Sequence, residues 1–299
     1  MGHQQAGGGA PLTGAGAALP TTEPAPPAGG EAVSVAGVWA GYDGRPALED
    51  VTLQIPRGAL VAIFGPNGGG KTTLLKLIAD LIEPWNGEVS VLGAPAGERA
   101  KQVAYVPQAE LVDWSFPVSV WDVAMMGRFP ALGLLRRPAA ADREAVEAAL
   151  DEVGMTGERH SQIGALSGGQ RRRAFLARAI AADPDLYLLD EPVTGVDVTT
   201  QEDLMKLLTT QTQRGRTVIA TTHDLAAAAE HFTTVVALNH RVIAVGRSEL
   251  VLDPDVLSRT YGGHMLVIQD RAVIIDDAHH HDTESGGERH FHEEGSKRR

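Results

Sequence analysis

Short apolar runs alternate with longer amphipathic stretches over most of the chain, from about Val33 to about Val245. The clearest of these runs cover residues 60–64, 186–190 and 217–221. Runs of this length that are apolar at nearly every position are typical of strands covered on both faces. The alternation therefore predicts an α/β fold in which helices flank a largely parallel sheet.

One segment departs from this alternation, between about residues 109 and 165. Positions 142–153 have the spacing of an amphipathic helix, and the segment contains no convincing buried strand. We therefore expect a mostly helical insertion within a main unit that extends over residues 31–262. Beyond that unit, two apolar runs flank a polar triplet within residues 263–275, which predicts a small terminal hairpin.

The two ends of the chain differ from the rest in composition. Residues 1–30 are rich in Gly, Ala, Pro and Thr, so they cannot bury enough apolar surface to offset their ordering entropy, and we expect disorder there. Residues 276–299 hold five of the 11 histidines among acidic residues, a set that suits borderline divalent ions such as Zn²⁺. The alternative is a solvated acidic tail, which we favour because nothing would hold the ligands in place.

Composition excludes several classes of protein. A formal net charge of −12 disfavours a nucleic-acid binder, which needs a basic face. The absence of cysteine excludes a disulfide framework and any thiolate metal site. No stretch approaches the roughly 18 apolar residues that span a bilayer, and no secretory signal is present. We expect a soluble, cytoplasmic chain whose membrane role, if it has one, comes through a partner.

A glycine-rich segment follows the first apolar run and fits the phosphate-loop pattern of Gly, four residues, Gly-Lys-Thr. Glycine lets backbone N–H groups turn onto phosphates, and the start of the following helix adds a positive dipole end. Lys71 should reach the β- and γ-phosphates, and the Thr72 hydroxyl should ligate Mg²⁺. The expected apolar face of that helix is Leu74, Leu75, Leu77, Ile78, Leu81 and Ile82. The expected nucleotide-binding residues are Gly65, Pro66, Asn67, Gly68, Gly69, Gly70, Lys71, Thr72 and Thr73.

Two adjacent carboxylates end the second apolar run. Asp190 would hold Mg²⁺, directly or through water, and Glu191 would orient or deprotonate the attacking water. The end of a strand releases the alternation of side chains, so neighbouring carboxylates can serve one site. An ordinary polar strand end is the alternative, because Asp-Glu-Pro also suits a turn.

A pentapeptide, residues 166–170, narrows the class of nucleotide-binding protein. Ser167 and Gln170 have the spacing of a capping box for a helix over residues 171–180. A cap does not explain Gly168 and Gly169 in the first turn, where glycine costs about 1 kcal/mol against alanine. Glycines there indicate that another group approaches the backbone closely.

With this pentapeptide the chain resembles the ABC ATPase family, over about residues 33–250 and with the motifs in family order. The resemblance implies a phosphate-loop NTPase core with an antiparallel β subdomain and a helical signature subdomain. It also implies hydrolysis of ATP to ADP and phosphate, with Mg²⁺. Ser167, Gly168, Gly169 and Gln170 would then contact ATP held by the phosphate loop of a second subunit, in a head-to-tail homodimer.

The resemblance assigns four further positions. Tyr42 would stack on adenine, with Trp39 as the competing candidate. Gln108 would sense Mg²⁺ and water, and Asp197 would lie in the loop that crosses the dimer interface. His223 would bond the γ-phosphate. The implied catalytic residues are thus Glu191, His223 and Gln108, and the implied magnesium ligands are Thr72, Gln108 and Asp190.

Four less specific stretches, residues 112–117, 122–128, 132–138 and 191–197, resemble the manganese and zinc importer branch of the family. This implies integral membrane permease subunits, a separate extracytoplasmic substrate-binding protein, and a peripheral location on the inner face of the membrane. Trp114, Phe116, Met125 and Met126 form either the surface that docks the permease or subdomain core.

Other functions remain open at this stage. Related branches that import chelated iron or cobalamin carry the same motifs. A non-transport ABC protein acting on ribosomes or DNA is disfavoured by the acidic charge and the single cassette. A phosphate-loop kinase leaves residues 166–170 unexplained.

Overall fold

The computed structural model describes residues 30–108, 116–133, 136–194, 197–262, 265–268 and 271–274. The three apolar runs form strands β3 (Leu60–Phe64), β7 (Leu186–Leu189) and β8 (Thr217–Thr221), and every residue in them is buried. Three more strands complete their sheet: β6 (Val103–Val106), β9 (Thr234–Asn239) and β10 (Arg241–Gly246). The order is β10-β9-β3-β8-β7-β6, parallel throughout except between β9 and β10. The prediction of a largely parallel sheet is confirmed, although β7 ends one residue before Asp190.

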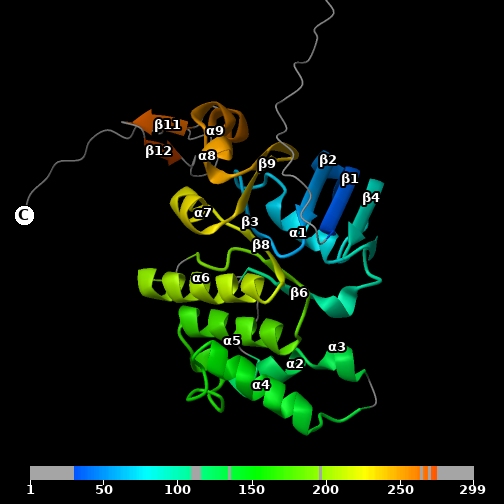
Figure 1. The fold of residues 1–299 in the computed structure, drawn as a ribbon, viewed down its shortest axis with the longest axis vertical. Helices are drawn as coiled ribbons and strands as arrows, with labels where there is room; N and C mark the ends of the chain where they lie inside the picture. The colour runs from blue at the N-terminus through cyan, green and yellow to red at the C-terminus, as the bar shows by residue number, and fades with distance from the viewer. Residues whose placement is uncertain are drawn as a thin grey trace, which may run out of the picture.

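A second sheet, antiparallel throughout, lies beside the first (Figure 1). Its order is β2-β1-β4-β5, with β1 (Glu31–Tyr42), β2 (Arg45–Pro56), β4 (Asn86–Val91) and β5 (Ala94–Pro95). Helix α1 (Lys71–Ile78) packs against this sheet, and their apolar side chains share a core with Leu186 and Leu188 of β7. The alternate β7 residues Tyr187 and Leu189 belong to a second core on the opposite face. Both faces of the central sheet are thus buried, as its continuous apolar strands require.

Helix α1 is shorter than its apolar pattern predicts. Asp80 adopts a left-handed conformation with a φ of +57°, and the Leu81 N–H donates back to the Lys76 carbonyl at 2.8 Å. This pairing is the Schellman arrangement that ends a helix. Leu81 therefore lies beyond the helix and is 57% exposed, so the expected apolar face was wrong at Leu81. Of the expected apolar face, Leu74, Leu75, Leu77 and Ile78 are buried on the helix itself, and Ile82 is partly buried beyond its end.

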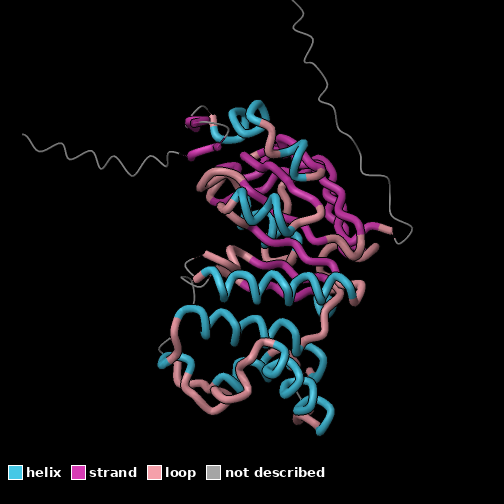
Figure 2. The backbone as a smooth tube through the Cα atoms, turned by 60° about the vertical axis from the view of Figure 1, so that its left-hand side comes forward, coloured by secondary structure: helices cyan, strands magenta, loops and turns pink. Residues whose placement is uncertain are grey.

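The described part of the segment between β6 and β7 is helical. It contains α2 (Val120–Met126), α3 (Phe129–Leu132), α4 (Ala140–Glu152) and α5 (Gly168–Ala181). Figure 1 and the rotated view in Figure 2 both place these helices together at one end of the molecule, away from the antiparallel sheet. Their apolar core includes Val146, Leu150 and Ala174 and continues onto the central sheet. The helical signature subdomain expected from the sequence is therefore present.

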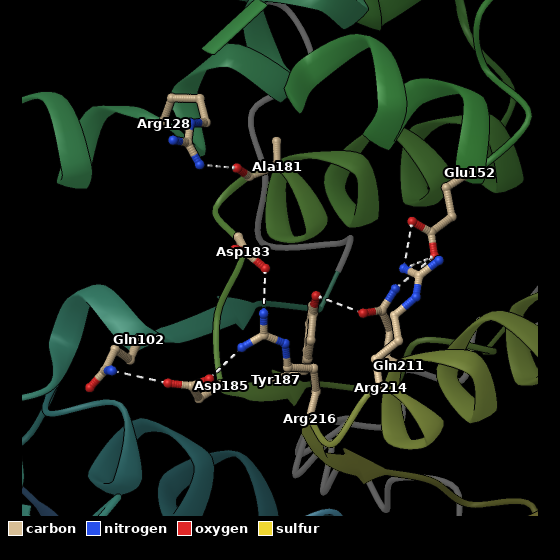
Figure 3. Close-up of polar contacts among 10 residues, drawn as sticks. All are labelled: Gln102, Arg128, Glu152, Ala181, Asp183, Asp185, Tyr187, Gln211, Arg214 and Arg216. Carbon is tan, nitrogen blue, oxygen red and sulfur yellow. Dashed lines mark hydrogen bonds and ion pairs between the residues drawn. The ribbon is translucent and has the colours of Figure 1, made fainter. Parts of the chain in front are cut away.

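A chain of polar contacts ties α4 to the central sheet through α6 (Val198–Gln213), as Figure 3 shows. Glu152, the last residue of α4, accepts hydrogen bonds from Gln211 Nε2 and Arg214 Nη1, both at 2.8 Å. Gln211 Oε1 in turn accepts from the Tyr187 hydroxyl at 3.2 Å, and burial raises the pKa of Tyr187. The buried amide of Gln211 thus has one partner on β7 and one on α4, which fixes the position of α4 relative to β7.

A second set of contacts holds the connection from α5 to β7 (Figure 3). Arg216 pairs with Asp183 at 2.6 Å and with Asp185, which also accepts from Gln102 Nε2 at 3.0 Å. Arg128 donates to the carbonyl of Ala181, the last residue of α5, at 2.8 Å. These contacts fix the end of α5 against the strand that leads to Asp190.

The remaining α-helices and strands of the described residues follow β8. They are α7 (Leu225–His231), α8 (Ser248–Val251), α9 (Pro254–Tyr261), β11 (Met265–Ile268) and β12 (Arg271–Ile274). Strands β11 and β12 pair antiparallel as a hairpin within residues 263–275. Residues 1–29 and 275–299, including all five tail histidines, lie outside the described residues. Among the described helices, none is long and apolar enough to cross a membrane.

Candidate functional site

The carboxyl ends of β6, β7, β8 and β3 meet at one edge of the central sheet. Val106 pairs with Leu189, and Leu189 pairs with Ala220. Two residues beyond the first pair come Gln108 and Glu191, and His223 follows three residues after Ala220. The carboxyl edge of an open parallel sheet is where α/β proteins bind ligands. Strand register therefore brings together residues that lie 83 and 32 positions apart in the sequence.

Glu191 is the centre of this group. Its Oε2 accepts from Gln108 Nε2 at 3.2 Å, and its Oε1 lies 2.5 Å from His223 Nε2. Its side chain is 12% exposed. The hydrogen bond with His223 holds the pKa of Glu191 below its ordinary value against the opposing effect of burial, with weaker help from the His223 charge, Thr194 and Lys71. Glu191 is therefore an ionised carboxylate at neutral pH, the form that can orient water or accept its proton.

The backbone of Glu191 is unusual, because its φ is +51°. Residues other than glycine rarely adopt this left-handed backbone conformation. The Glu191 N–H donates to Thr221 Oγ1 at 2.8 Å, and the Thr221 hydroxyl donates to Asp190 Oδ1 at 2.7 Å. Thr221 was not among the residues expected from the sequence. The available signal was a hydroxyl in the last position of a buried strand whose three central residues are apolar, two residues before His223.

Asp190 is the residue that fits a magnesium ion best. It is 3% exposed, and its Oδ2 atom is buried and makes no hydrogen bond of normal geometry among the described residues, although the Asp190 carboxylate interacts with the Tyr105 hydroxyl and helps burial to raise the pKa of Tyr105. A buried carboxylate oxygen without such a bond is costly, so this atom is suited to a cation. Mg²⁺ prefers oxygen ligands and commonly takes one or two carboxylates, with phosphate oxygens and water for the rest. Asp190, the Thr72 hydroxyl and the Gln108 amide are therefore a donor set of the right chemistry.

The phosphate loop wraps around Lys71. This side chain is only 7% exposed, and its Nζ donates to the carbonyls of Gly65 at 2.9 Å and Pro66 at 3.0 Å. Gly65 has a φ of +154°, and a Cβ there would lie 1.8 Å from the Leu238 carbonyl oxygen of β9. Gly70, with φ +94°, precedes α1 and provides no side chain to cap its first turn. A helix start of this kind accepts an anion, and the buried ammonium adds a positive charge beside it.

The predicted capping box at the start of α5 is confirmed. Ser167 Oγ accepts from the Gln170 N–H at 3.3 Å, and Gln170 Oε1 accepts from the Ser167 N–H at 3.0 Å. Ser167 and Gly168 are exposed. A Cβ on Gly168 would meet nothing within 4 Å, and its φ lies outside the left-handed region. Nothing among the described residues of the chain therefore requires glycine at this position.

The two aromatic candidates for adenine differ in their surroundings. Tyr42, at the end of β1, is 44% exposed, and Lys76 Nζ of α1 lies 5.8 Å from its ring centroid. Trp39 is half-buried, with the Arg241 guanidinium 5.9 Å from its ring centroid. Tyr42 therefore lies beside the helix that follows the phosphate loop, which favours it over Trp39.

Asp197 is the N-cap of α6. It accepts from the Thr200 N–H at 3.0 Å and from the Thr200 hydroxyl at 2.7 Å, and these bonds hold the pKa of Asp197 below its ordinary value. This local role explains an aspartate at the position. Its expected place at a dimer interface stays a prediction, and the preceding residues 195 and 196 lie outside the described residues.

The four side chains considered for permease docking do not share one environment. Met125 is 8% exposed and belongs to the core of the helical unit, so for this residue the core alternative is correct. Met126 is half-buried, whereas Phe116 is 61% exposed. Trp114 lies outside the described residues. Of the four, Phe116 is the most exposed described side chain, and Met126 is only partly accessible.

Comparison with known proteins relates this chain to the ATP-binding proteins of transport systems. The family described as "ABC transporter" matches residues 48–194. The chain is 42% identical to the manganese transport system ATP-binding protein MntB of Bacillus subtilis (strain 168), over 81% of this chain and 96% of that protein. It is 44% identical to the zinc transport system ATP-binding protein TroB of Treponema pallidum (strain Nichols), over 78% of this chain and 88% of that protein.

A solved structure shares the fold. It is described as "An inward-facing conformation of a putative metal-chelate type ABC transporter", and it aligns with a TM-score of 0.70 at 26% identity. The alignment covers 82% of this chain and 98% of that one. The α/β core, the antiparallel sheet and the helical unit therefore all have counterparts in one known architecture.

Proposed function

The chain belongs to the ABC transporter family, whose ATP-binding subunits hydrolyse ATP to drive transport, and from this premise we propose that it powers an importer of manganese or zinc. The observation that carries the substrate class is the identity of 42–44% to ATP-binding proteins named for manganese and zinc transport. The transported ion does not reach the ATP site, so the assignment depends on these relatives rather than on the geometry of the site.

We assign the roles in hydrolysis as follows. Lys71 and the start of α1 bind the β- and γ-phosphates, and Tyr42 stacks on adenine. Glu191 orients the attacking water and takes its proton, while Gln108 holds the Glu191 carboxylate from one side and His223 from the other. Asp190, Thr72 and Gln108 hold Mg²⁺, which when bound neutralises charge on the phosphate oxygens.

The functional unit is proposed to be a head-to-tail homodimer. Helix α5 packs on α2 and α4, whereas α1 packs on the antiparallel sheet, so the signature and the phosphate loop of one chain belong to separate parts of the fold. The exposed Gly168 has no neighbour of its own that excludes a side chain. A second copy would bring its ATP against Ser167 and Gly168, which explains why glycine is present.

Gly168→Ala is expected to change the stability of the subunit and its ATP hydrolysis in opposite directions. In the isolated subunit we expect the free energy of unfolding to rise by about 0.5–1 kcal/mol, because alanine replaces glycine in a helix without a clash. ATP hydrolysis should nevertheless fall about tenfold or more, because the added methyl overpacks the closed dimer. Denaturant unfolding and steady-state phosphate release measure the two effects.

Gly157→Ala is the matched control for this prediction. Gly157 also has nothing within 4 Å of an added Cβ and no left-handed φ. It lies outside the α5 start, so alanine there should leave hydrolysis unchanged. Equal activity of Gly168→Ala and wild type would contradict the assignment of this surface to a composite ATP site.

The remaining partners follow from the same proposal. Permease subunits bind the ATPase dimer, with Phe116 on the docking side, and place it at the inner face of the membrane. A separate extracytoplasmic protein delivers the substrate. In the domain organisation we propose, residues 31–262 form the ATPase unit, 109–165 its helical insertion and 263–275 the hairpin, flanked by residues 1–30 and by the His-rich tail over 276–299. The acidic net charge of −12 argues against a nucleic-acid partner.

Elemental analysis tests the transported substrate. Cells that lack this gene should lose manganese or zinc specifically, and the wild-type gene should restore the level whereas Glu191→Gln should not. Iron is measured in the same samples, because import of chelated iron is the alternative that the sequence leaves open. A fall in iron alone would favour that alternative. Unchanged levels of all three metals, with no compensating system, would refute import of manganese or zinc and leave the ATPase assignment intact.

A further inference from the structure

The Thr221 hydroxyl connects the two adjacent carboxylate residues of the site. Thr221 is fully buried at the last position of β8, and its Oγ1 lies 2.8 Å from the Glu191 nitrogen and 2.7 Å from Asp190 Oδ1. A hydroxyl has one proton to donate and lone pairs that accept. Here the proton goes to Asp190, and a lone pair takes the Glu191 N–H. Thr221 therefore binds the side chain of Asp190 and the backbone of Glu191.

This arrangement bears on how Glu191 is aimed. With φ at +51°, the Glu191 backbone leaves β7 through a conformation that the chain does not favour by itself. Such a conformation persists where surrounding contacts determine it, and the hydrogen bond to Thr221 is a contact of this kind. The turn sets the direction in which the Glu191 carboxylate leaves the backbone, toward Gln108 and His223.

The same hydroxyl makes the two oxygens of the Asp190 carboxylate different. Oδ1 accepts from Thr221, whereas Oδ2 is buried and makes no hydrogen bond of normal geometry among the described residues, with the Tyr105 hydroxyl as the other group that interacts with this carboxylate. Because one oxygen is fixed by a neighbouring strand, the other is held in one direction. A valine of the same shape would fill the space but could make neither hydrogen bond.

We propose that Thr221 is a positioning residue for ATP hydrolysis, whose hydroxyl holds the left-handed turn at Glu191 and orients Asp190. The inference rests on the proposed roles of Glu191 and Asp190. In this role Thr221 contacts neither ATP nor the attacking water. Its loss should therefore reduce the rate of hydrolysis much more than the affinity for ATP.

The decisive comparison is between Thr221→Val and Thr221→Ser in the full chain. Amide hydrogen exchange of Glu191, followed by mass spectrometry on peptides that contain it, should speed up about tenfold or more in the valine variant, because the N–H loses its acceptor. In the serine variant it should stay close to wild type. The kcat should fall by about 10–100-fold in Thr221→Val, the scale expected for a misplaced catalytic group, with KM for ATP within about threefold. Thr221→Ser should recover most of the rate.

Thr217→Val is the matched control, because it removes a buried hydroxyl from the opposite end of the same strand. Thr217 is 1% exposed, and its Oγ1 accepts from the Gly58 N–H at 3.0 Å. This variant should lower stability while Glu191 exchange and kcat stay near wild type. If Thr217→Val slows hydrolysis as much as Thr221→Val, the effect is one of general stability and the inference is wrong.

Two further results would overturn the inference. One is unchanged exchange at Glu191 in a folded Thr221→Val protein, and the other is a serine variant as impaired as the valine variant. Failure of the proposed function looks different, because the wild-type chain itself would then release no phosphate from ATP. The exchange measurement does not depend on hydrolysis and tests the positioning role in either case.

Discussion

Glu191→Gln is expected to bind ATP normally and to lose about 10²–10⁴ in turnover, the usual contribution of a general base. Glutamine keeps the size of the side chain and can still bond Gln108, but its amide cannot take a proton from water. It also removes the negative charge that faces His223 at 2.5 Å. Single-turnover phosphate release gives the rate, and a fluorescent ATP analogue gives the affinity.

The same variant should accumulate the closed dimer. With hydrolysis blocked, two chains stay joined around ATP, so size-exclusion chromatography with ATP and Mg²⁺ should show a dimer that wild type shows only transiently. Glu202→Gln, an identical change at an exposed position on α6, controls for the loss of one carboxylate. A Glu191→Gln protein that hydrolyses ATP at the wild-type rate would refute the role of Glu191.

Lys71→Met is expected to abolish tight nucleotide binding. Methionine keeps most of the apolar stem but removes the ammonium group that the loop surrounds with the Gly65 and Pro66 carbonyls. A hydrogen bond to a charged group contributes about 1.5–3 kcal/mol, so the loss of two such bonds to phosphate oxygens weakens ATP binding by about 10²-fold or more. Isothermal titration with ATP measures the change.

Lys206→Met provides the comparison for this prediction. Its side chain is 73% exposed on α6 and pairs only with the neighbouring Asp203 in the described structure. Replacement should leave ATP affinity unchanged. If Lys71→Met binds ATP as tightly as Lys206→Met does, the phosphates do not lie against this loop.

The two variants fail at different steps, which makes them useful together. Lys71→Met should neither bind ATP tightly nor dimerise with it, whereas Glu191→Gln should do both without turnover. A chain that loses affinity in both variants would point to a disturbed fold rather than to separate roles. Thermal unfolding of each variant without nucleotide distinguishes these explanations.

Local patterns were sufficient wherever the physical cause is local. Continuous apolar runs predicted β3 and β8 at their observed bounds, because a strand buried on both faces has apolar side chains on both. The Ser167 and Gln170 spacing predicted the start of α5, since a capping box is formed within four residues. The prediction from hydrophobic spacing was wrong at Leu81. The left-handed backbone at Asp80 ends the helix, and the spacing of apolar residues carries no information about such a change in backbone conformation.

The sequence by itself determined the class of site, because the phosphate loop, the carboxylate pair and the signature each lie within a few consecutive residues. Only the tertiary structure decided how the separate pieces meet. Parallel pairing of β6, β7 and β8 places Gln108 and His223 on the two oxygens of Glu191, although 83 and 32 residues separate them from it. Thr221 was not predicted for the same reason, since its two partners, Asp190 and Glu191, follow the end of the neighbouring strand β7. Motifs are encoded along the chain, whereas the hydrogen bonds that aim them depend on strand order and register.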